Sequence, residues 1–491
     1  MLIDSIISLL APSNIIIMII GVIWGMVFGS IPGLTATLAI VVLIPITYGM
    51  GPTLGMAMLV SIYIGAISGG LVSAILIGMP GTPSSITTCF DGFPLAKKGL
   101  ARKALGVGIT SNLIGCLVSW VCLVGLAPFI ARFALKFTSL DFVALILFAF
   151  TAVVSLSGKS LLKGVIMTIF GLLVATIGTD PTYGMYRNTF GLKILRGGVG
   201  STPAMIGLFV VSQVFSEITH VSEKFLTPKA EKVSPFLSMK EFVQNIPNFI
   251  RSSFIGIMIG ILPGIGGALS NFVAYDQAKK YSKHPELFGQ GSYEGLIASE
   301  VANNASVGGA LIPMLSMGIP GDAATAVLLG GLMLHGLQPG PLLMKEHPEL
   351  IYGIYAAVLI ASILMFIVMM GGIRVFPTLL RIKKSFLLPF VLVIGMVGCY
   401  NLKFSINDVW IAVIFGIVGF FLKKYDYPLT PVVISLILGS MFENNLRLGL
   451  IVSGGSLLPL ITHPVSLIFM ILTVLSLVFY VFQQIKKTKK V

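Results

Sequence analysis

Long apolar stretches separated by short polar intervals run through the whole chain. The stretches recur at the length of a membrane-spanning helix and lack the short alternating pattern of an outer-membrane barrel strand. This pattern predicts an all-α polytopic membrane protein with about twelve transmembrane helices. The main apolar stretches lie near residues 14–30, 34–46, 54–78, 104–130, 140–157, 161–178, 203–216, 254–261, 353–373, 386–400, 407–422, 428–442 and 464–484.

Four Pro-Gly pairs interrupt apolar runs rather than polar loops. They are Pro32-Gly33, Pro80-Gly81, Pro263-Gly264 and Pro320-Gly321. Proline removes a backbone donor and glycine relaxes the backbone, so peptide groups at these points lose their helical partners. In hydrocarbon such groups are tolerated only where protein or a water-filled cavity covers them. We therefore expect discontinuous or re-entrant helices at these four breaks.

The order of the breaks repeats along the chain. Pro263 follows Pro32 by 231 residues, and Pro320 follows Pro80 by 240 residues. Chance is the alternative, because glycine is abundant and Pro-Gly is an ordinary turn dipeptide. The apolar flanks favour a duplication, since turns in soluble loops have polar neighbours. Broken helices in matching positions of two halves indicate a transport site, and we expect the two repeats to be inverted.

A polar stretch of mixed charge separates the two halves. Residues 217–251 carry charges of both signs and three prolines, which is typical of a linker. We predict a first membrane repeat over 1–216, a cytoplasmic linker over 217–251, a second membrane repeat over 252–485 and a basic cytoplasmic tail over 486–491.

Composition narrows the class of protein further. With 56% hydrophobic and only 10% charged residues, the chain has too little polar surface for a water-soluble globule. Its net charge of +14 arises from short basic clusters between apolar runs, which the positive-inside rule explains better than nucleic-acid binding. We therefore expect a cytoplasmic C-terminus. The clusters are Lys97, Lys98, Arg102 and Lys103; Arg381, Lys383 and Lys384; Lys423 and Lys424; and Lys486, Lys487, Lys489 and Lys490.

Catalytic and metal-binding patterns are missing from the sequence. The five histidines are scattered, the four cysteines have no metal-ligand spacing, and no Walker, Gly-x-Ser-x-Gly or His-Glu-x-x-His motif occurs. We predict no enzyme activity, no ATP site and no cofactor. The first thirteen residues contain Asp4 but no Lys or Arg, so we expect the first span to be retained rather than cleaved as a signal peptide.

Residues after the second and fourth breaks have the pattern of helix starts. Thr82 is expected as N-cap with Pro83 at the first helical position, and Ser84 and Ser85 follow. Such a start offers free amides and a positive dipole end, which suit a carboxylate. Asp322 is expected as N-cap of residues 323–334, where its charge would compete with an anion unless a cation lies nearby.

Polar residues near the fourth break suit a cation. Asn303 and Asn304 offer amide oxygens, which are ligands for a hard ion such as sodium. Interhelical hydrogen bonding is the alternative role for these amides. An acidic residue bordering an apolar run is near an interface, paired or functional, because an unpaired charge is costly in the membrane. For Glu300 and Asp322 a function or a functional cap is weighed equally against the other readings, whereas Asp91 and Asp276 are expected near a membrane interface.

The chain resembles the large membrane subunit of the tripartite tricarboxylate transporters over nearly its whole length. The resemblance rests on Gly29-Ser-Ile-Pro-Gly-Leu-Thr-Ala-Thr37, Pro80-Gly-Thr-Pro-Ser-Ser85, Asp91-Gly-Phe-Pro-Leu-Ala-Lys-Lys-Gly99, Leu262-Pro-Gly-Ile-Gly266, Ala302-Asn-Asn-Ala-Ser306 and Gly318-Ile-Pro-Gly-Asp-Ala-Ala-Thr325. The stretch Gly65–Gly70 departs from the more continuous Tyr-Gly-Gly-Ser run expected of the family.

The resemblance implies a secondary transporter of the bacterial inner membrane. It implies uptake of citrate and other carboxylates by symport with sodium or protons. It also implies two partners, a small membrane subunit and an extracytoplasmic solute-binding protein. A carboxylate channel or exporter that needs no binding protein is the alternative.

We expect the carboxylate and the coupling ion to bind at the breaks between the two halves. The residues expected to bind substrate are Thr35, Pro80, Gly81, Thr82, Ser84, Ser85, Gly264 and Gly321. The residues expected to bind the coupling ion, with sodium as the one metal considered, are Asn303, Asn304 and Asp322.

Overall fold

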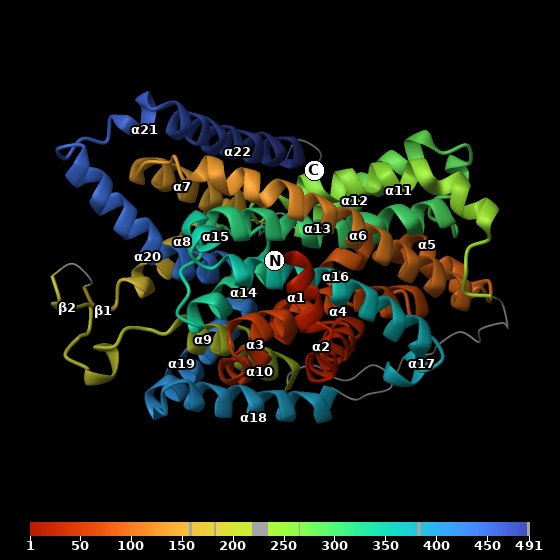
Figure 1. Cartoon of the computed structure of the whole chain (residues 1–491), viewed down its shortest axis with the longest axis horizontal. Helices are drawn as coiled ribbons and strands as arrows, with labels where there is room; N and C mark the ends of the chain where they lie inside the picture. The colour runs from red at the N-terminus through yellow and green to blue at the C-terminus, as the bar shows by residue number, and fades with distance from the viewer. Residues whose placement is uncertain (157–159, 181–182, 219–233, 265, 381–383, 489–491) are drawn as a thin grey trace.

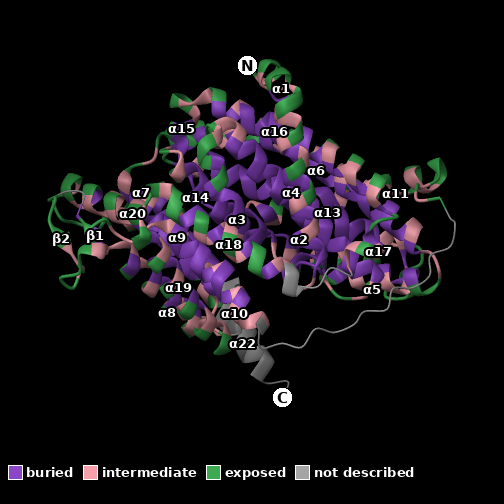
Figure 2. Cartoon of the chain, turned by 90° about the horizontal axis from the view of Figure 1, so that it is seen from below, coloured by how far each residue is buried: buried purple, intermediate pink, exposed green. Residues whose placement is uncertain are grey.

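Two helices, α4 (Pro52–Leu76) and α13 (Tyr293–Met317), form the centre of the computed structural model (Figure 2). Every residue of the ranges 55–76 and 295–316 is buried. The structure describes the chain except residues 157–159, 181–182, 219–233, 265, 381–383 and 489–491. Because both helices are enclosed by protein, their polar residues face other protein groups rather than lipid.

Glycines allow α2 (Pro12–Ser30) to approach α4 closely. The Cα atoms of Gly25 and Gly29 face the backbone of α4, and a Cβ at either position would collide with the carbonyl oxygen of Ile62 or Ala66. Small residues permit such backbone contact between membrane helices.

The same contacts recur between α11 (Met239–Gly260) and α13. Here Gly256 and Gly260 face the carbonyl oxygens of Ala302 and Ser306. Each α11 glycine lies 231 residues after its α2 counterpart, and each α13 carbonyl lies 240 residues after its α4 counterpart. The recurrence of both contacts at the two sequence shifts is what a duplication of these helices predicts.

Helices of each half pack on helices of the other half. The long helix α6 (Ala101–Ala134) lies along α13, and α16 (Pro348–Gly372) lies along α4. The helices that follow the second and fourth breaks also contact helices of the other half. Besides α4, the helix α5 (Ile86–Lys97) contacts α12 (Gly266–Tyr281) and α13, while α14 (Ala323–Leu334) contacts α3 (Ala36–Thr47) and α4.

Peripheral elements surround this centre (Figure 1). Helix α22 (Pro464–Thr488) lies along α7 (Ser139–Leu156), and an antiparallel hairpin of β1 (Gly178–Thr179) and β2 (Tyr186–Arg187) projects from one end, with Gly178 opposite Arg187. The other helices are α1 (Leu2–Leu9), α8 (Leu161–Ala175), α9 (Ser201–Met205), α10 (Ser212–Ile218), α15 (Pro341–Glu346), α17 (Phe376–Leu379), α18 (Lys384–Lys403), α19 (Ile406–Lys424), α20 (Leu429–Val452) and α21 (Pro459–Thr462). A π-helical stretch covers Ile206–Val211, and 3-10 turns cover Tyr48–Met50, Pro83–Ser85, Lys193–Leu195 and Pro285–Leu287.

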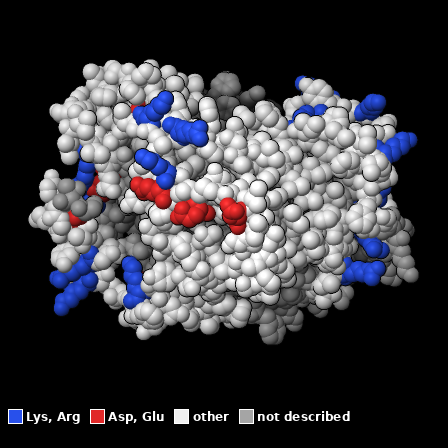
Figure 3. Space-filling view, in the orientation of Figure 1, with Lys and Arg blue, Asp and Glu red and all other residues white. Residues whose placement is uncertain are grey.

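The described residues include 6 helices long and apolar enough to cross a membrane, namely α2, α4, α6, α16, α19 and α20. Shorter apolar helices, among them α3, α7, α8 and α14, accompany them. The surface in Figure 3 has a broad uncharged area between groups of Lys and Arg. The prediction of an all-α multi-pass membrane protein is confirmed, whereas twelve spans and an inverted relation of the repeats stay predictions.

Helix α11 begins inside the stretch predicted to be linker. The hydroxyl of Ser238 accepts from the Glu241 amide at 3.3 Å, and the Glu241 carboxylate accepts from the Ser238 amide at 2.8 Å. This capping box starts a helix that continues through Pro247. Residues 219–233 of the predicted linker lie outside the described residues, and the proposed division of the chain into repeats stays a prediction.

Candidate functional site

The second break forms a tight turn between α4 and α5. Gly78, with φ of 71°, reverses the chain after α4, and Pro83 opens a 3-10 turn that leads into α5. Thr82 occupies the N-cap position, as expected, but its side chain bonds with no helix amide. Instead its hydroxyl oxygen lies 3.0 Å from the hydroxyl oxygens of Ser84 and Ser85. The side chains at this helix start are therefore three linked hydroxyl groups, all buried.

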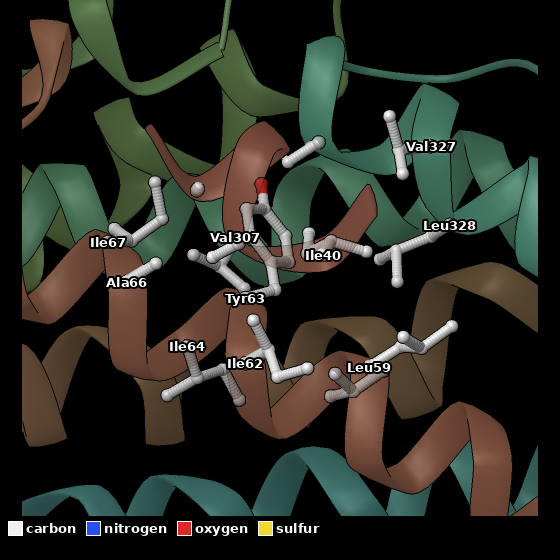
Figure 4. Packing of buried hydrophobic residues seen from close by; sticks show 14 of the residues in the cluster. Ile40, Leu59, Ile62, Tyr63, Ile64, Ala66, Ile67, Val307, Val327 and Leu328 are labelled. Atoms are coloured by element: carbon white, nitrogen blue, oxygen red, sulfur yellow. The ribbon is translucent and has the colours of Figure 1, made fainter. Parts of the chain in front are cut away.

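The fourth break ends in a capped helix. As the sequence predicted, Asp322 is the N-cap of α14, and its Oδ1 accepts from the Thr325 amide at 2.7 Å and from the Thr325 hydroxyl at 2.8 Å. Its other oxygen, Oδ2, accepts from the hydroxyl of Tyr63 at 2.5 Å. Figure 4 shows the Tyr63 ring among Ile40, Val307 and other apolar side chains of the core. Within the described residues Asp322 forms no ion pair.

The third break touches the fourth through its backbone. Gly264, with φ of 78°, donates from its amide to the Gly321 carbonyl oxygen at 2.8 Å. The first residue of α12 is Gly266, where an added Cβ would lie 2.9 Å from the Cβ of Asp322. The third and fourth breaks are thus held together beside the start of α12.

The first turn of α12 also faces the second break. A Cβ on Gly267 would lie 2.6 Å from Oδ1 of Asn303 and 3.2 Å from the Cβ of Ser84. Glycine is required at this position because any larger side chain would fill the space between α12, α13 and the second break. Ser84, Asn303 and Asp322 therefore gather around the first two residues of α12.

Two buried amides at this place have unpaired polar atoms. Asn303 is fully buried, and within the described residues neither its Oδ1 nor its Nδ2 has a hydrogen-bond partner. On α12 the fully buried Asn271 donates from Nδ2 to the carbonyl oxygen of Ser84, but its own Oδ1 is unpaired. A buried polar group without a partner costs about 1–3 kcal/mol, and such groups in native proteins are uncommon. The unpaired atoms mark a position where a polar ligand would gain hydrogen bonds.

Asn304 points away from this position into a separate buried network. Its Oδ1 accepts from the Ser68 hydroxyl at 2.6 Å, and its Nδ2 lies 2.6 Å from the terminal amide of Asn112. In the orientation that directs its Nδ2 toward Glu300, Asn112 donates to Oε2 of Glu300 at 2.7 Å. The other Glu300 oxygen accepts from the Thr88 hydroxyl. Glu300 is fully buried among these neutral groups.

Asp91, expected near a membrane interface, is buried in a cradle of backbone amides. Its Oδ1 accepts from the amides of Gly289, Gly291 and Ser292 at 2.8, 2.9 and 2.8 Å. The three amides all bind Oδ1 and stabilise the carboxylate charge. The cradle fastens α5 to the loop between α12 and α13.

The residues predicted as site residues fall into three places. Ser84, Gly264, Asn303, Gly321 and Asp322 lie around the start of α12, and the turn formed by Pro80, Gly81, Thr82 and Ser85 leads to Ser84. Thr35 lies at the first break, where it caps α3 by accepting from the Leu38 amide at 3.2 Å. Asn304 belongs to the Glu300 network.

Sequence reasoning missed Tyr63, Gly267 and Asn271. Asn271 had a readable signal, because it is a polar amide about two helical turns after the third break in an apolar context. Tyr63 had none, since an aromatic residue inside an apolar helix is usually core. In the described part of the chain no cluster of three or more His, Cys, Asp or Glu side chains could hold a metal ion.

Comparisons with known proteins give a consistent picture. The family described as "Tripartite tricarboxylate transporter TctA family" matches residues 15–434. A protein of Agrobacterium vitis, "Uncharacterized 52.8 kDa protein in TAR-I ttuC' 3'region", is 34% identical over 457 residues, which cover 93% of this chain and 91% of that protein. A second protein of the same organism, "Uncharacterized protein in TAR-II ttuC' 3'region", is 33% identical over 211 residues, or 43% of this chain and 87% of that protein. No solved structure matches the chain.

Proposed function

The chain belongs to the tripartite tricarboxylate transporter TctA family, and on this premise we propose that it is the large permease subunit of a transporter that takes up carboxylates, driven by a sodium or proton gradient. The family consists of transport proteins, and its members work with a small membrane subunit and a solute-binding subunit. We propose both as partners of this chain, with the solute-binding protein outside a bacterial inner membrane and the C-terminus of the chain in the cytoplasm.

The unpaired, fully buried amide of Asn303 is the observation that carries this proposal. It lies beside Ser84 in the first turn after the second break and beside Gly267 in the first turn of α12. Helix starts attract anions through free amides and the positive end of the helix dipole. A carboxylate bound here would need no buried Lys or Arg, and its oxygens would pair with groups that lack partners.

The packing of the halves supports inverted repeats and alternating access. Helix α5 meets the α12–α13 loop through Asp91 in its middle and through its C-cap Lys98, which donates to the Gln290 carbonyl oxygen at 2.7 Å. The end of α14 meets the α3–α4 region, because a Cβ on Gly55 would lie 2.8 Å from Nε2 of His335. Lys97 and Lys98 mark the first meeting point as cytoplasmic by the positive-inside rule. The second would then face outward, and the site between the halves would open to each side in turn.

The coupling ion is the remaining part of the proposal. The three residues expected to bind the coupling ion have different neighbours. Asn303 lies beside Gly267, Asn304 accepts from Ser68, and Asp322 accepts from Tyr63. Asp322 is the charged member of this set and faces the start of α12. To distinguish sodium from proton coupling, the two gradients are imposed separately in the uptake experiment described next.

Uptake by membrane vesicles tests the proposed function. Vesicles containing this chain and its small membrane subunit, supplied with the solute-binding protein and labelled citrate, should accumulate citrate when a sodium or proton gradient is imposed. Accumulation should stop when both gradients are collapsed. Uptake that persists with ATP alone would contradict the proposal, and uptake that is unchanged without the binding protein would favour a channel or exporter.

A further inference from the structure

The turns at the second and fourth breaks are built alike. Thr82 and Asp322 hold equivalent positions, 240 residues apart. The Thr82 hydroxyl lies 3.0 Å from the hydroxyl of Ser85, and the Asp322 carboxylate accepts from the hydroxyl of Thr325 at 2.8 Å. Thr325 follows Ser85 by the same 240 residues. The residue before each turn is a glycine that faces the carbonyl oxygen of an equivalent glycine, Gly29 for Gly81 and Gly260 for Gly321.

Each of the two turns is approached by a side chain from the central helix of the other half, and this side chain is of a different type at the two turns. At the fourth break it is Tyr63 on α4, whose hydroxyl donates to the Asp322 carboxylate. The equivalent residue, 240 positions later, is Asn303 on α13, which faces the region of the second break. Within the described residues the Asn303 amide has no hydrogen-bond partner. Thr82, unlike Asp322, has no carboxylate that could accept a hydrogen bond from it. The second break thus has the donors of the fourth break without its acceptor.

We propose that a carboxylate group of the transported molecule binds between the Thr82–Ser85 turn and Asn303, in the position that the Asp322 carboxylate occupies at the fourth break. This inference rests on the proposed function and specifies its site. The donors are Nδ2 of Asn303 and the hydroxyl groups of Thr82 and Ser84, because an ionised carboxylate only accepts hydrogen bonds. The Asn303 amide can turn either end toward the ligand, since neither end is engaged.

Asn271 acts as a positioning residue in this site. Its Nδ2 holds the backbone carbonyl of Ser84, and its helix places Gly267 against Asn303. The site thereby combines the second break of the first half with α12 and α13 of the second half. Asn303 is assigned to the carboxylate rather than to a cation.

The site also explains why the duplicated breaks are chemically unequal. At the fourth break the chain supplies its own carboxylate, and the neighbouring positions equivalent to Asn271 and Ser84 are Ile40 and Ala324. That copy already holds the Asp322 carboxylate, whose two oxygens accept from Tyr63 and Thr325. Each chain therefore binds one carboxylate group by this geometry.

Thr82→Asp is the direct test, because it supplies the second break with an internal carboxylate. In vesicles with both partner subunits, citrate uptake should fall about tenfold or more, since one charge-assisted interaction corresponds to about that factor. Thr82→Asn has the same shape without the charge and should retain more uptake than Thr82→Asp. Ser405→Asp, which places a charge at the start of α19, should transport citrate at the rate of the unaltered chain.

A binding measurement separates loss of the site from loss of the fold. Citrate should raise the Tm of the purified chain in detergent in a concentration-dependent manner, and this shift should be absent in Thr82→Asp and in Asn303→Ala. Asn303→Asp, which places a like charge beside the ligand, should also abolish the shift.

The possible failures are distinguishable. If the unaltered chain transports citrate but Thr82→Asp and Asn303→Ala transport it equally well, the assigned site is wrong while the proposed function stands. If the unaltered chain with both partners takes up neither citrate nor acetate, the proposed function itself fails. Should Thr82→Asp not fold, the Asn303 variants decide the question.

Discussion

The hydroxyl of Tyr63 lies 2.5 Å from Oδ2 of Asp322 and joins the central helix of the first half to the start of α14 in the second half. Tyr63 is fully buried, and Asp322 uses its other oxygen to cap its own helix. One carboxylate thus starts a helix and links the halves.

Tyr63→Phe should destabilise the protein because it removes one donor from the Asp322 carboxylate. Hydrogen bonds to charged groups contribute about 1.5–3 kcal/mol, so the Tm in detergent should fall clearly. Tyr355→Phe is the matched control, since the buried Tyr355 hydroxyl has no hydrogen-bond partner in the described part of the chain and its loss should be neutral or stabilising. Equal Tm values for the two variants would contradict the role given to the Tyr63 hydroxyl.

Gly29→Ala should prevent close packing of α2 on α4. The new Cβ would meet the backbone carbonyl of Ala66, which cannot move aside as a side chain can, and overpacking costs about 1–3 kcal/mol or more. We expect a low yield of monodisperse protein in size-exclusion chromatography. Gly125→Ala on α6 has open space around its Cβ and should give a normal yield.

Asp91→Asn should weaken the attachment of α5 to the α12–α13 loop. Three backbone amides would then face a neutral oxygen instead of a charged one, with an expected loss of about 1–3 kcal/mol. Hydrogen exchange of the amides of Gly289, Gly291 and Ser292 should accelerate. The exposed Asp276 on α12 provides the control Asp276→Asn, which should leave the exchange of these amides unchanged.

The capping box of α11 predicts a pH dependence of stability. Burial raises the pKa of Glu241, but hydrogen bonds from Lys103 and Ser238 outweigh burial and lower the pKa below its ordinary value of 4.5. A carboxyl with a lowered pKa stabilises the fold above pH 4.5, and this contribution is lost as the pH falls through the folded-state pKa.

The Tm difference between the unaltered chain and Glu241→Gln should therefore be full near neutral pH and shrink below pH 4.5. The exposed Glu346 serves as control, since Glu346→Gln should leave the Tm unaltered near neutral pH. A Tm difference for Glu241→Gln that grows on acidification would contradict a lowered pKa of Glu241 in the folded protein.

Local signals in the sequence predicted the helix starts well. Asp322 and the bounds of α14 follow from the N-cap pattern, and Pro83 opens the turn before α5, because capping depends on residues within one turn of each other. The capping box of Ser238 and Glu241 is an equally local signal, and it starts α11 inside the stretch that charge and proline content marked as linker.

Contacts between the halves could not be read from the sequence. Tyr63 and Asp322 are 259 residues apart, and Asp91 meets an amide 198 residues away. The recurring Pro-Gly pairs indicated that matching parts exist, but they did not indicate that each broken helix would lie on the other half. Asn303 and Asn304 are neighbours in sequence, yet they point into different networks, because successive residues of a helix are rotated by about 100°.

Because α5 and α14 each pack on the other half, neither half of the chain contains all residues of the proposed carboxylate site. The turn with Ser84 comes from one half, while the amides of Asn271 and Asn303 come from the other. Two fragments made from separate genes should each lack carboxylate binding and regain it only on assembly. If the two halves arose by duplication, as we propose, identical halves would have assembled two equal positions. Exchanging a few side chains would then be enough to leave a single site, with no change of fold.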